Sequence, residues 1–302
     1  MESYCLVTSK AEMKEAYKKH DVIVVKGDIA HKLQGVGTLS NMSSNKMIAF
    51  LAAAGTAIVA VTALPETAGI SSFAAIPSVV TMSVISGLTI QQIVSFIFIG
   101  LYLLLDYSKD YTCIDRTRLG EEEVVYVRKN CDVSKLNFDK ILKNGDVLSA
   151  KRMLQYRHYG IYVGNGEIVH FASETGDWGD DILIHKAPIV NFCKNNKKIE
   201  ILDFKNKHGN CYFNVRDGLV RKKVNCYVYS GQETAGRALS IAEEVEKGIP
   251  REEFKKKYNL FTNNCEHFAL WCKLGVKDSK QVDNIIDTLL KGILASTIKM
   301  PI

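Results

Sequence analysis

The sequence predicts an α+β protein with two parts. A small N-terminal α/β segment carries an apolar helical hairpin, and a C-terminal domain combines an antiparallel sheet with helices. Uncharged apolar runs occupy residues 47–64 and 68–105, and β-rich runs separated by turn residues occupy 145–229. Helical spacing of apolar residues returns in 233–246 and again after Asn264. Strands followed by helices are typical of α+β domains.

The N-terminal segment begins with short helices and strands. Residues 10–20 are a charged helical stretch, and Val22–Lys26 is a run of β-branched residues that predicts a strand. Asp28 is expected to cap a short helix that continues through Leu33. Residues 121–129 are again strand-like. We expect them to pair with Val22–Lys26 and to complete a small α/β unit around the apolar hairpin.

The apolar hairpin is long enough to enter a membrane. Glu66 is the single charged residue between Met47 and Leu105. We expect one apolar helix at 47–64 and a second at 88–105, because about 18 to 20 apolar residues cross a bilayer core. Two crossings would leave both ends of the chain on the same side of the membrane. A hairpin buried inside a soluble domain is the alternative.

Charge and cysteine content restrict the partners and the compartment. The 302 residues include 39 basic and 33 acidic ones and no aromatic-interleaved basic motif, so no nucleic acid partner is expected. The lysine clusters are typical of a solvated face or of contact with an anionic membrane. Eight cysteines without a CxxC pair indicate thiols in a reducing compartment, and the start of the chain lacks a secretory signal. We therefore expect a membrane-associated protein whose C-terminal domain faces the cytosol.

The C-terminal domain is expected to cover residues 134–302, after an N-terminal part of residues 1–133. It opens with a turn at Gly145 and Asp146. Two β-rich runs, Tyr156–Gly164 and Glu167–Phe171, are joined through Gly-Asn-Gly, which is a strong hairpin signal. Further strands are predicted at Asp181–His185, Lys198–Phe204 and Asn225–Tyr229, and helices at Glu233–Glu246 and Arg251–Tyr258.

Cys265 is a candidate nucleophile. Asn263 and Asn264 are good helix N-cap residues, and the apolar residues that follow are spaced as in a helix. Cys265 therefore falls in the first helical turn, where unpaired N–H groups and the helix dipole favour thiolate over thiol. Cys272, about two turns further on, is expected to lie in the core. A thiol nucleophile still needs a base.

Two histidines of the predicted hairpin can supply that base. His158 lies in the first strand and His170 near the end of the second. Folding at the turn brings the strands side by side, so the two imidazoles can approach each other. One histidine would hold the thiol proton and the other would orient it, as cysteine chemistry requires. No two candidate ligands have zinc-site spacing, so neither a metal nor a cofactor is expected.

These motifs resemble those of the lecithin retinol acyltransferase family. They are Gly145 and Asp146, the run from His158 to Gly164, the run from Ile168 to His170, and the block from Asn264 to Phe268. Their order and spacing are similar to the family pattern over residues 141–282. The family includes the H-rev-type phospholipases and acyltransferases and belongs to the NlpC-like, circularly permuted branch of papain-like thiol enzymes. The resemblance therefore implies a permuted papain-like fold for the C-terminal domain.

The resemblance also implies a role for each candidate residue. Cys265 would attack a glycerophospholipid ester and form a thioester acyl-enzyme, His158 would act as general base, and His170 would orient His158. Backbone N–H groups near Cys265 would stabilise the oxyanion. His267 is expected to pack or to hydrogen-bond within the helix. Transfer of the acyl group to water would make the enzyme an A1/A2-type phospholipase, and transfer to an amine or hydroxyl would make it an acyltransferase.

Two other functions stay open from the sequence. The same cysteine and histidines would serve a papain-like peptidase or amidase. The apolar hairpin favours a lipid, because tethering an enzyme to a bilayer raises the effective concentration of a substrate confined there. The second alternative is a non-catalytic, membrane-active or interaction protein in which residues 47–105 carry the function.

Overall fold

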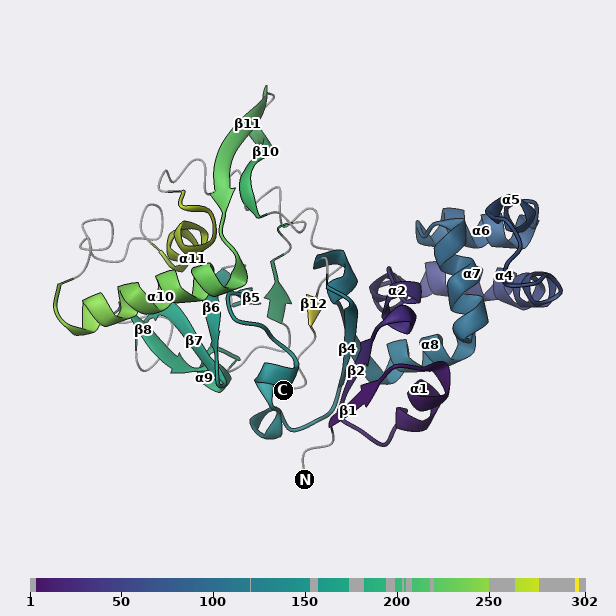
Figure 1. Ribbon diagram of the computed structural model, residues 1–302, viewed down its shortest axis with the longest axis horizontal. Coiled ribbons are helices and arrows are strands. Elements are labelled where there is room, and N and C mark those ends of the chain that lie inside the picture. The colour runs from purple at the N-terminus through teal and green to yellow at the C-terminus, as the bar shows by residue number, and fades with distance from the viewer. Residues whose placement is uncertain are drawn as a thin grey trace. The chain divides into compact units, whose positions relative to one another are not determined.

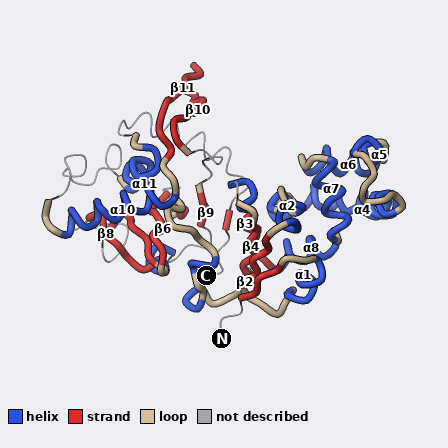
Figure 2. The backbone as a smooth tube through the Cα atoms, in the orientation of Figure 1, coloured by secondary structure: helices blue, strands red, loops and turns tan. Residues whose placement is uncertain are grey.

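A computed structural model of the protein describes residues 4–119, 121–152, 157–173, 182–193, 199–202, 204, 208–217, 220–249, 264–276 and 297–298. The chain divides into two compact units, residues 1–131 and residues 132–302 (Figure 1). Each unit has its own sheet and its own hydrophobic core. Both units combine helices with strands (Figure 2).

The sheet of the first unit has the strand order β1-β2-β4-β3. Its strands are β1 (Tyr4–Val7), β2 (Val22–Lys26), β3 (Tyr111–Asp115) and β4 (Glu123–Arg128). β1 runs parallel to β2, and the other pairs are antiparallel. The predicted pairing of β2 with the second strand-like run is confirmed, since Val24 lies opposite Val125. Both of these central strands are almost entirely buried, which explains their unbroken apolar, β-branched runs.

The helices of the first unit connect these strands. They are α1 (Lys10–Ala16), α2 (Asp28–Lys32), α3 (Gly37–Ser40), α4 (Ser44–Thr62), α5 (Ile70–Ala74), α6 (Pro77–Ser86), α7 (Ile90–Ile99), α8 (Leu101–Asp110) and the 3₁₀ turn η1 (Arg116–Leu119). α1 ends before residue 20, and Lys18 beyond it has a positive φ of 62°. Asp28 lies in the first turn of α2 but does not cap it, because the N-cap is Gly27 at φ 71°.

The predicted apolar hairpin is wrong in its second arm. Residues 88–105 are not one helix, because Gly100, with φ 122°, separates α7 from α8. α7 has 10 residues and rises only about 15 Å, half the thickness of a bilayer core. Within the described chain, α4 is the one helix of 19 residues that is long and apolar enough to cross a membrane by itself. The pair α6 and α7 is bent by 105° and would add a second span only if both helices acted as one.

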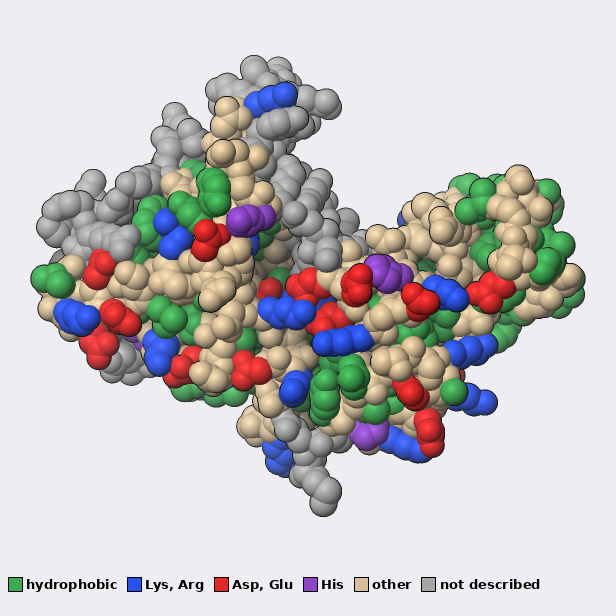
Figure 3. Space-filling model, viewed as in Figure 1, with side chains coloured by type: hydrophobic (Ala, Val, Ile, Leu, Met, Phe, Trp, Pro, Cys, Tyr) green, Lys and Arg blue, Asp and Glu red, His purple; other side chains and the backbone are tan. Residues whose placement is uncertain are grey.

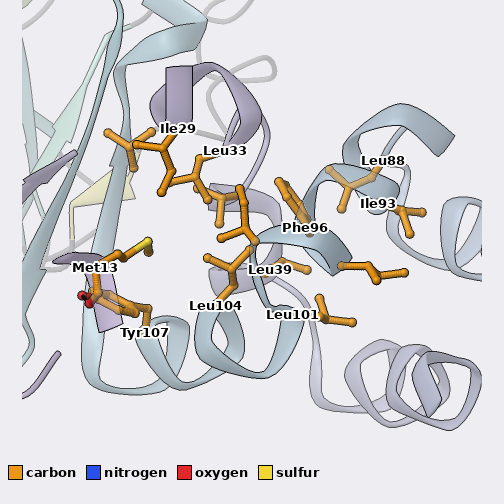
Figure 4. Packing of buried hydrophobic residues seen from close by; sticks show 14 of the residues in the cluster. Met13, Ile29, Leu33, Leu39, Leu88, Ile93, Phe96, Leu101, Leu104 and Tyr107 are labelled. Atoms are coloured by element: carbon orange, nitrogen blue, oxygen red, sulfur yellow. Dashed lines mark hydrogen bonds between the residues drawn. The ribbon is translucent and has the colours of Figure 1, made fainter. Parts of the chain in front are cut away.

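α7 is a core helix of the first unit. Ile93 and Phe96 are fully buried in the same cluster as Leu33 and Leu39, which follow β2 in the chain (Figure 4). The apolar side chains of α7 therefore pack between protein elements. Burial in a protein core and contact with lipid select the same residue types, so composition alone does not distinguish the two environments.

Six of the described strands of the second unit form an antiparallel sheet in the order β12-β9-β5-β6-β7-β8. They are β5 (Val147–Lys151), β6 (Arg157–Gly164), β7 (Glu167–Ala172), β8 (Leu183–Pro188), β9 (Ile199–Ile201) and β12 (Thr297–Ile298). A separate hairpin consists of β10 (Gly209–Asp217) and β11 (Val220–Val228). The sequence pattern does not predict β10 and predicts only the end of β11, because charged residues interrupt the apolar alternation there.

The predicted hairpin around the two histidines is confirmed by β6 and β7. Gly164 pairs with Glu167 across a two-residue turn in which Asn165 has φ 55° and Gly166 has φ 70°. Two-residue hairpin turns with positive φ at both positions match the twist of the strands, and Asn-Gly is the preferred sequence.

Two helices cover one face of this sheet. The helices of the second unit are α9 (Ile189–Cys193), α10 (Gly231–Glu246) and α11 (Cys265–Leu274), and the 3₁₀ turns are η2 (Val133–Lys135) and η3 (Phe138–Lys140). Ala238 of α10 and Phe268 of α11 share a core with Tyr159 of β6. The helix predicted at Arg251–Tyr258 lies outside the described residues. The mixed α+β class with an antiparallel sheet is as predicted.

Gly145 lies just before β5, where the start of α10 comes close. Its φ is 83°, and its N–H donates to the Tyr162 carbonyl at 2.7 Å. A Cβ at this position would overlap the backbone of Gly231. Gly145→Ala should therefore destabilise the second unit by roughly 3 kcal/mol or more. The loss combines a left-handed backbone penalty with an overlap that backbone atoms do not relieve.

Gly166→Ala is the matched control for that substitution. Gly166 has φ 70° but no atom within 4 Å of its Cβ position, so a loss of about 1 kcal/mol is expected. Urea unfolding followed by tryptophan fluorescence measures both variants, because Trp178 and Trp271 both belong to the second unit. Equal losses for the two variants would contradict the close approach of Gly145 and Gly231.

Candidate active site

Cys265 is the first residue of α11 and is fully buried. Asn264 is the N-cap, as predicted, and its Oδ1 accepts from the backbone N–H groups of Glu266 and His267, both at 3.0 Å. Nδ1–H of His267 donates to the same oxygen at 2.8 Å, which confirms the expected hydrogen bond of His267 within the helix. These three bonds define where the helix starts and so where Cys265 lies.

The thiol of Cys265 lies beside the first residues of β6. Its Sγ donates to the backbone carbonyl of Arg157, with an S···O distance of 3.8 Å. Arg157 begins β6 and immediately precedes His158. Cys265 and Arg157 are 108 positions apart in the sequence. The fold therefore brings the Cys265 sulfur beside the peptide bond that precedes His158.

The two predicted histidines are in direct contact. Nε2 of His158 and Nδ1 of His170 are 2.8 Å apart, and both side chains are buried. Gly160 lies opposite His170 in the strand pairing, so the two histidines are diagonal neighbours on one face of the sheet. Gly160 leaves room for the side chains of β7 on this face, because a Cβ there would come within 2.6 Å of Ile168 Cδ1 and 3.2 Å of the His170 Cβ.

His185 belongs to the same row of imidazoles and is not indicated by the sequence pattern. It pairs directly with His170 across β7 and β8, and their ring centroids are 4.8 Å apart. Phe192 of α9 packs against His158 at 5.2 Å and His170 at 5.9 Å between ring centroids. A strand ending at His185 is predicted, but its register against β7 is not. Although three histidines lie in this row, the described residues hold no group of three or more ligating side chains placed for a metal ion.

Burial sets the protonation state of His158. Burial, with smaller contributions from the charges of Arg152 and His185, lowers the pKa of this imidazole from 6.5 to about 3. His158 is therefore neutral at neutral pH and has a lone pair that can accept a proton. Burial also raises the pKa of the Cys193 thiol on α9 to about 12, so this second buried cysteine stays protonated.

An ion pair anchors the start of β6 on the face of the sheet opposite to the histidines, because Arg157 and His158 are successive residues of one strand. The Arg157 guanidinium forms a salt bridge with Glu200 of β9 and donates to Ser149 Oγ of β5 at 2.9 Å. Glu200 and Ser149 are both buried. Three adjacent strands are thus joined at the residue whose carbonyl accepts from the Cys265 thiol, and this restricts how that carbonyl and the neighbouring His158 can move.

Comparison with known families identifies the second unit. Residues 140–278 match the family model described as Lecithin retinol acyltransferase. These residues form a lecithin retinol acyltransferase domain. The resemblance seen in the motifs around His158, His170 and Cys265 is thereby confirmed at the level of the family.

Curated relatives of the lecithin retinol acyltransferase domain come from animals and a plant. Mouse Lecithin retinol acyltransferase is 27% identical over 154 residues, which are 48% of this chain and 60% of that protein. Human Phospholipase A and acyltransferase 4 is 23% identical over 145 residues, 47% of this chain and 75% of that protein. Arabidopsis thaliana Protein LEAD-SENSITIVE 1 is 27% identical over 164 residues, 44% of this chain and 57% of that protein. The chain thus spans only part of the length of these relatives.

The first unit matches a different family model. Residues 6–128 match the model described as Uncharacterised protein PM1101. This match ends before the lecithin retinol acyltransferase domain begins at residue 140. The apolar helices α4 to α7 therefore lie outside the lecithin retinol acyltransferase domain. Two of the relatives are named for an activity, one as an acyltransferase and the other as a phospholipase A and acyltransferase.

Proposed function

We propose that the lecithin retinol acyltransferase domain catalyses acyl transfer from a glycerophospholipid, with Cys265 as nucleophile, His158 as general base and His170 as the residue that orients the base. The observation that carries this proposal is the position of the Cys265 sulfur beside the peptide leading into His158, whose imidazole contacts His170. Relatives named for acyl transfer and for phospholipase activity support a lipid acyl donor.

The proposed role of His158 as base determines which ring nitrogen of each histidine carries a hydrogen. His158 can take the thiol proton at Nδ1 while Nε2 carries its own hydrogen and donates to Nδ1 of His170. His170 would then hold His158 in one tautomer and stabilise the imidazolium that forms. Because burial keeps His158 neutral at rest, we expect the thiol proton to move as the sulfur attacks.

The proposed reaction has two steps. In the first, the Cys265 sulfur bonds to the ester carbonyl carbon, the thiol proton passes to His158, and the lysophospholipid oxygen takes this proton as the C–O bond breaks. In the second, water, an amine or a hydroxyl gives a proton to His158 and attacks the thioester carbon, and the proton returns to the departing sulfur. The same thioester therefore leads to a fatty acid or to an acylated acceptor.

The backbone N–H of Cys265 is the proposed oxyanion donor. Of the N–H groups in the first turn of α11, that of Cys265 is the nearest to the sulfur along the chain. One donor of this kind typically lowers the barrier by about 3 to 4 kcal/mol.

We also propose a circularly permuted papain-like fold for this domain. A buried cysteine begins a helix that packs on an antiparallel sheet, and the two histidines stand on adjacent strands of that sheet. Both histidines precede the cysteine in the chain, the reverse of the order in papain. These features support the permuted arrangement that the sequence motifs imply.

Membrane association through the first unit, with the catalytic domain at the cytosolic face, is part of the same proposal. α4 supports it, because only 22% of its apolar window is buried inside the protein, whereas a core helix of a soluble protein is mostly buried. A substrate confined to a bilayer would meet a tethered enzyme at a high effective concentration.

Trapping the acyl-enzyme tests the catalytic proposal. After incubation with phosphatidylcholine vesicles, the protein should gain the mass of one acyl group on Cys265, and neutral hydroxylamine should remove it. Cys265→Ala should not be acylated, whereas Cys193→Ala, which removes another buried cysteine, should be. A thioester formed from a peptide and not from phospholipid would favour the peptidase alternative. No adduct from either substrate would favour a non-catalytic role.

A further inference from the structure

We propose that α4, α5 and α6 form a lipid-binding surface that enters a single leaflet of a phospholipid bilayer, with α4 lying in the plane of the membrane and not across it. This inference rests on the proposed membrane association and specifies its topology. It replaces the two-crossing hairpin expected from composition.

The surface consists of large apolar side chains that the described residues of the unit leave at least partly exposed. Its members are Ile48, Leu51 and Val59 of α4, Ile70 of α5, and Val80 and Val84 of α6, with exposed fractions from 38% for Val80 to 80% for Val84. In Figure 3 the end of this unit that carries α4 to α6 shows hydrophobic and uncharged side chains, with charged side chains at its border. An exposed apolar area of this kind marks an interaction site.

Charge on and around this surface suits a lipid. Glu66 is the only charged residue between Met47 and Leu105, and its Oε1 accepts from Lys32 Nζ at 2.9 Å. Lys46, in the first turn of α4, is exposed. An apolar face with lysines at its edge matches the acyl boundary and the anionic headgroups of one leaflet.

The opposite side of α4 packs into the protein core from Phe50 to Val61. Phe50, Ala54, Ala57 and Val61 recur at helical spacing and are fully buried. They belong to the same cluster as Phe96 of the core helix α7. If α4 crossed a bilayer, its four buried residues would leave the protein core, or the sheet of the first unit and its charged residues would enter the hydrocarbon with it. Either change would cost free energy.

Both ends of α4 are also connected to helices that pack on the sheet of the first unit. α3 packs against β3 and α8 and ends only four residues before α4 begins at Ser44. Beyond the other end, Glu66 pairs with Lys32, the last residue of α2. A helix of 19 residues is about 28 Å long, nearly the thickness of a bilayer core, so a crossing would put its ends at opposite headgroup layers. Attachment at both ends to one compact unit favours the in-plane arrangement.

Vesicle flotation of the full chain tests the lipid surface. The vesicles contain phosphatidylcholine and about 30% phosphatidylserine, which supplies the anionic headgroup charge. The wild type should float with these vesicles. The double variant Val59→Asp and Val84→Asp should bind at least about tenfold more weakly, since each change puts a charge into the acyl region. Ile249→Asp, at an equally exposed apolar side chain of the second unit, should bind like the wild type. Unchanged binding of the double variant would overturn the proposed surface.

Site-specific labelling tests the in-plane topology. Asn45→Cys, beside Lys46, and Thr67→Cys, beside Glu66, are exposed positions at the charged border near the two ends of α4. Both should react with a membrane-impermeant maleimide on intact vesicles as fully as in detergent. Peptide mass spectrometry separates these sites from the native cysteines. Protection of one end would overturn the in-plane arrangement in favour of a crossing.

The two proposals fail separately. Floating protein whose Cys265 is not acylated would support the surface and contradict the catalytic proposal. The double variant should still acylate Cys265 from a water-soluble p-nitrophenyl ester, because the surface lies outside the lecithin retinol acyltransferase domain. Loss of this reaction together with loss of flotation would indicate misfolding and would remove the support for a lipid surface.

Discussion

Replacing Cys265 with alanine should reduce fatty-acid release and acyl transfer from phospholipid vesicles to the background rate. The expected loss is on the order of 10⁴-fold or more, because no second nucleophile can form the thioester once the sulfur is absent. The side chain is fully buried at the start of α11, so the smaller alanine should leave the helix and its Asn264 cap in place. Turnover is measured as released fatty acid, with urea unfolding as the check on folding.

Two other buried cysteines are matched controls for this variant. Cys272 lies about two turns along the same helix, and Cys193 lies on α9 with a pKa raised to about 12 by burial. Cys272→Ala and Cys193→Ala each remove a buried thiol without touching the proposed nucleophile. Both should keep turnover within a few-fold of the wild type. Substantial turnover by Cys265→Ala would show that the acyl group passes through another residue.

Replacing His158 with asparagine should lower the rate of thioester formation by about 10²- to 10⁴-fold, the usual contribution of a general base. The variant lacks a group that can accept the thiol proton. It also loses the Nε2 contact with His170, because the shorter asparagine amide ends near the position of Nδ1. Vesicle binding should not change. His208→Asn is the matched control, because His208 is an exposed histidine that contacts Glu233 and Tyr227 and neither proposed catalytic histidine. A variant at His158 that keeps full activity would exclude it as the base.

The buried state of His158 also predicts how stability depends on pH. Its pKa is about 3 in the folded protein and 6.5 when it is exposed, so between these pH values the unfolded chain binds a proton that the folded protein does not. The wild type should therefore lose stability relative to His158→Asn as the pH falls from about 6.5, by about 1.4 kcal/mol per pH unit. Above pH 6.5 the difference should be constant.

Urea unfolding at pH 7, 5.5 and 4.5, followed by tryptophan fluorescence, measures this difference in the second unit. The remaining histidines are common to both proteins, so their titration cancels in the comparison. Parallel stability curves over this range would show that His158 titrates normally in the folded state.

Local sequence signals account for most of the candidate site. The Asn-Gly turn fixes a hairpin with positive φ at both positions, and the Asn264 cap places Cys265 at the first residue of α11. Each signal depends on backbone preferences within a few residues, so each can be read along the chain. Strand composition likewise predicts β2 and β4, and their pairing follows because each is buried on both faces.

Other features of the site depend on contacts that are distant in sequence. The place of His185 opposite His170 comes from the register of β7 and β8, which the sequence does not specify. The start of β6 is likewise held by Arg157 and Glu200, 43 residues apart. The catalytic roles of Cys265, His158 and His170, and the division of the chain near residue 133, stay predictions.

The apolar block shows most clearly what the sequence determined and what tertiary structure decided. The sequence by itself determined that residues 47–105 are apolar with a single charged residue, and that their first apolar run is long enough to cross a bilayer. Only the tertiary structure decided that α7 is a core helix, that Gly100 ends it, and that one side of α4 is packed against protein. The physical reason is that protein cores and lipid tails favour the same apolar side chains. Which of the two a helix meets depends on what the rest of the chain places beside it.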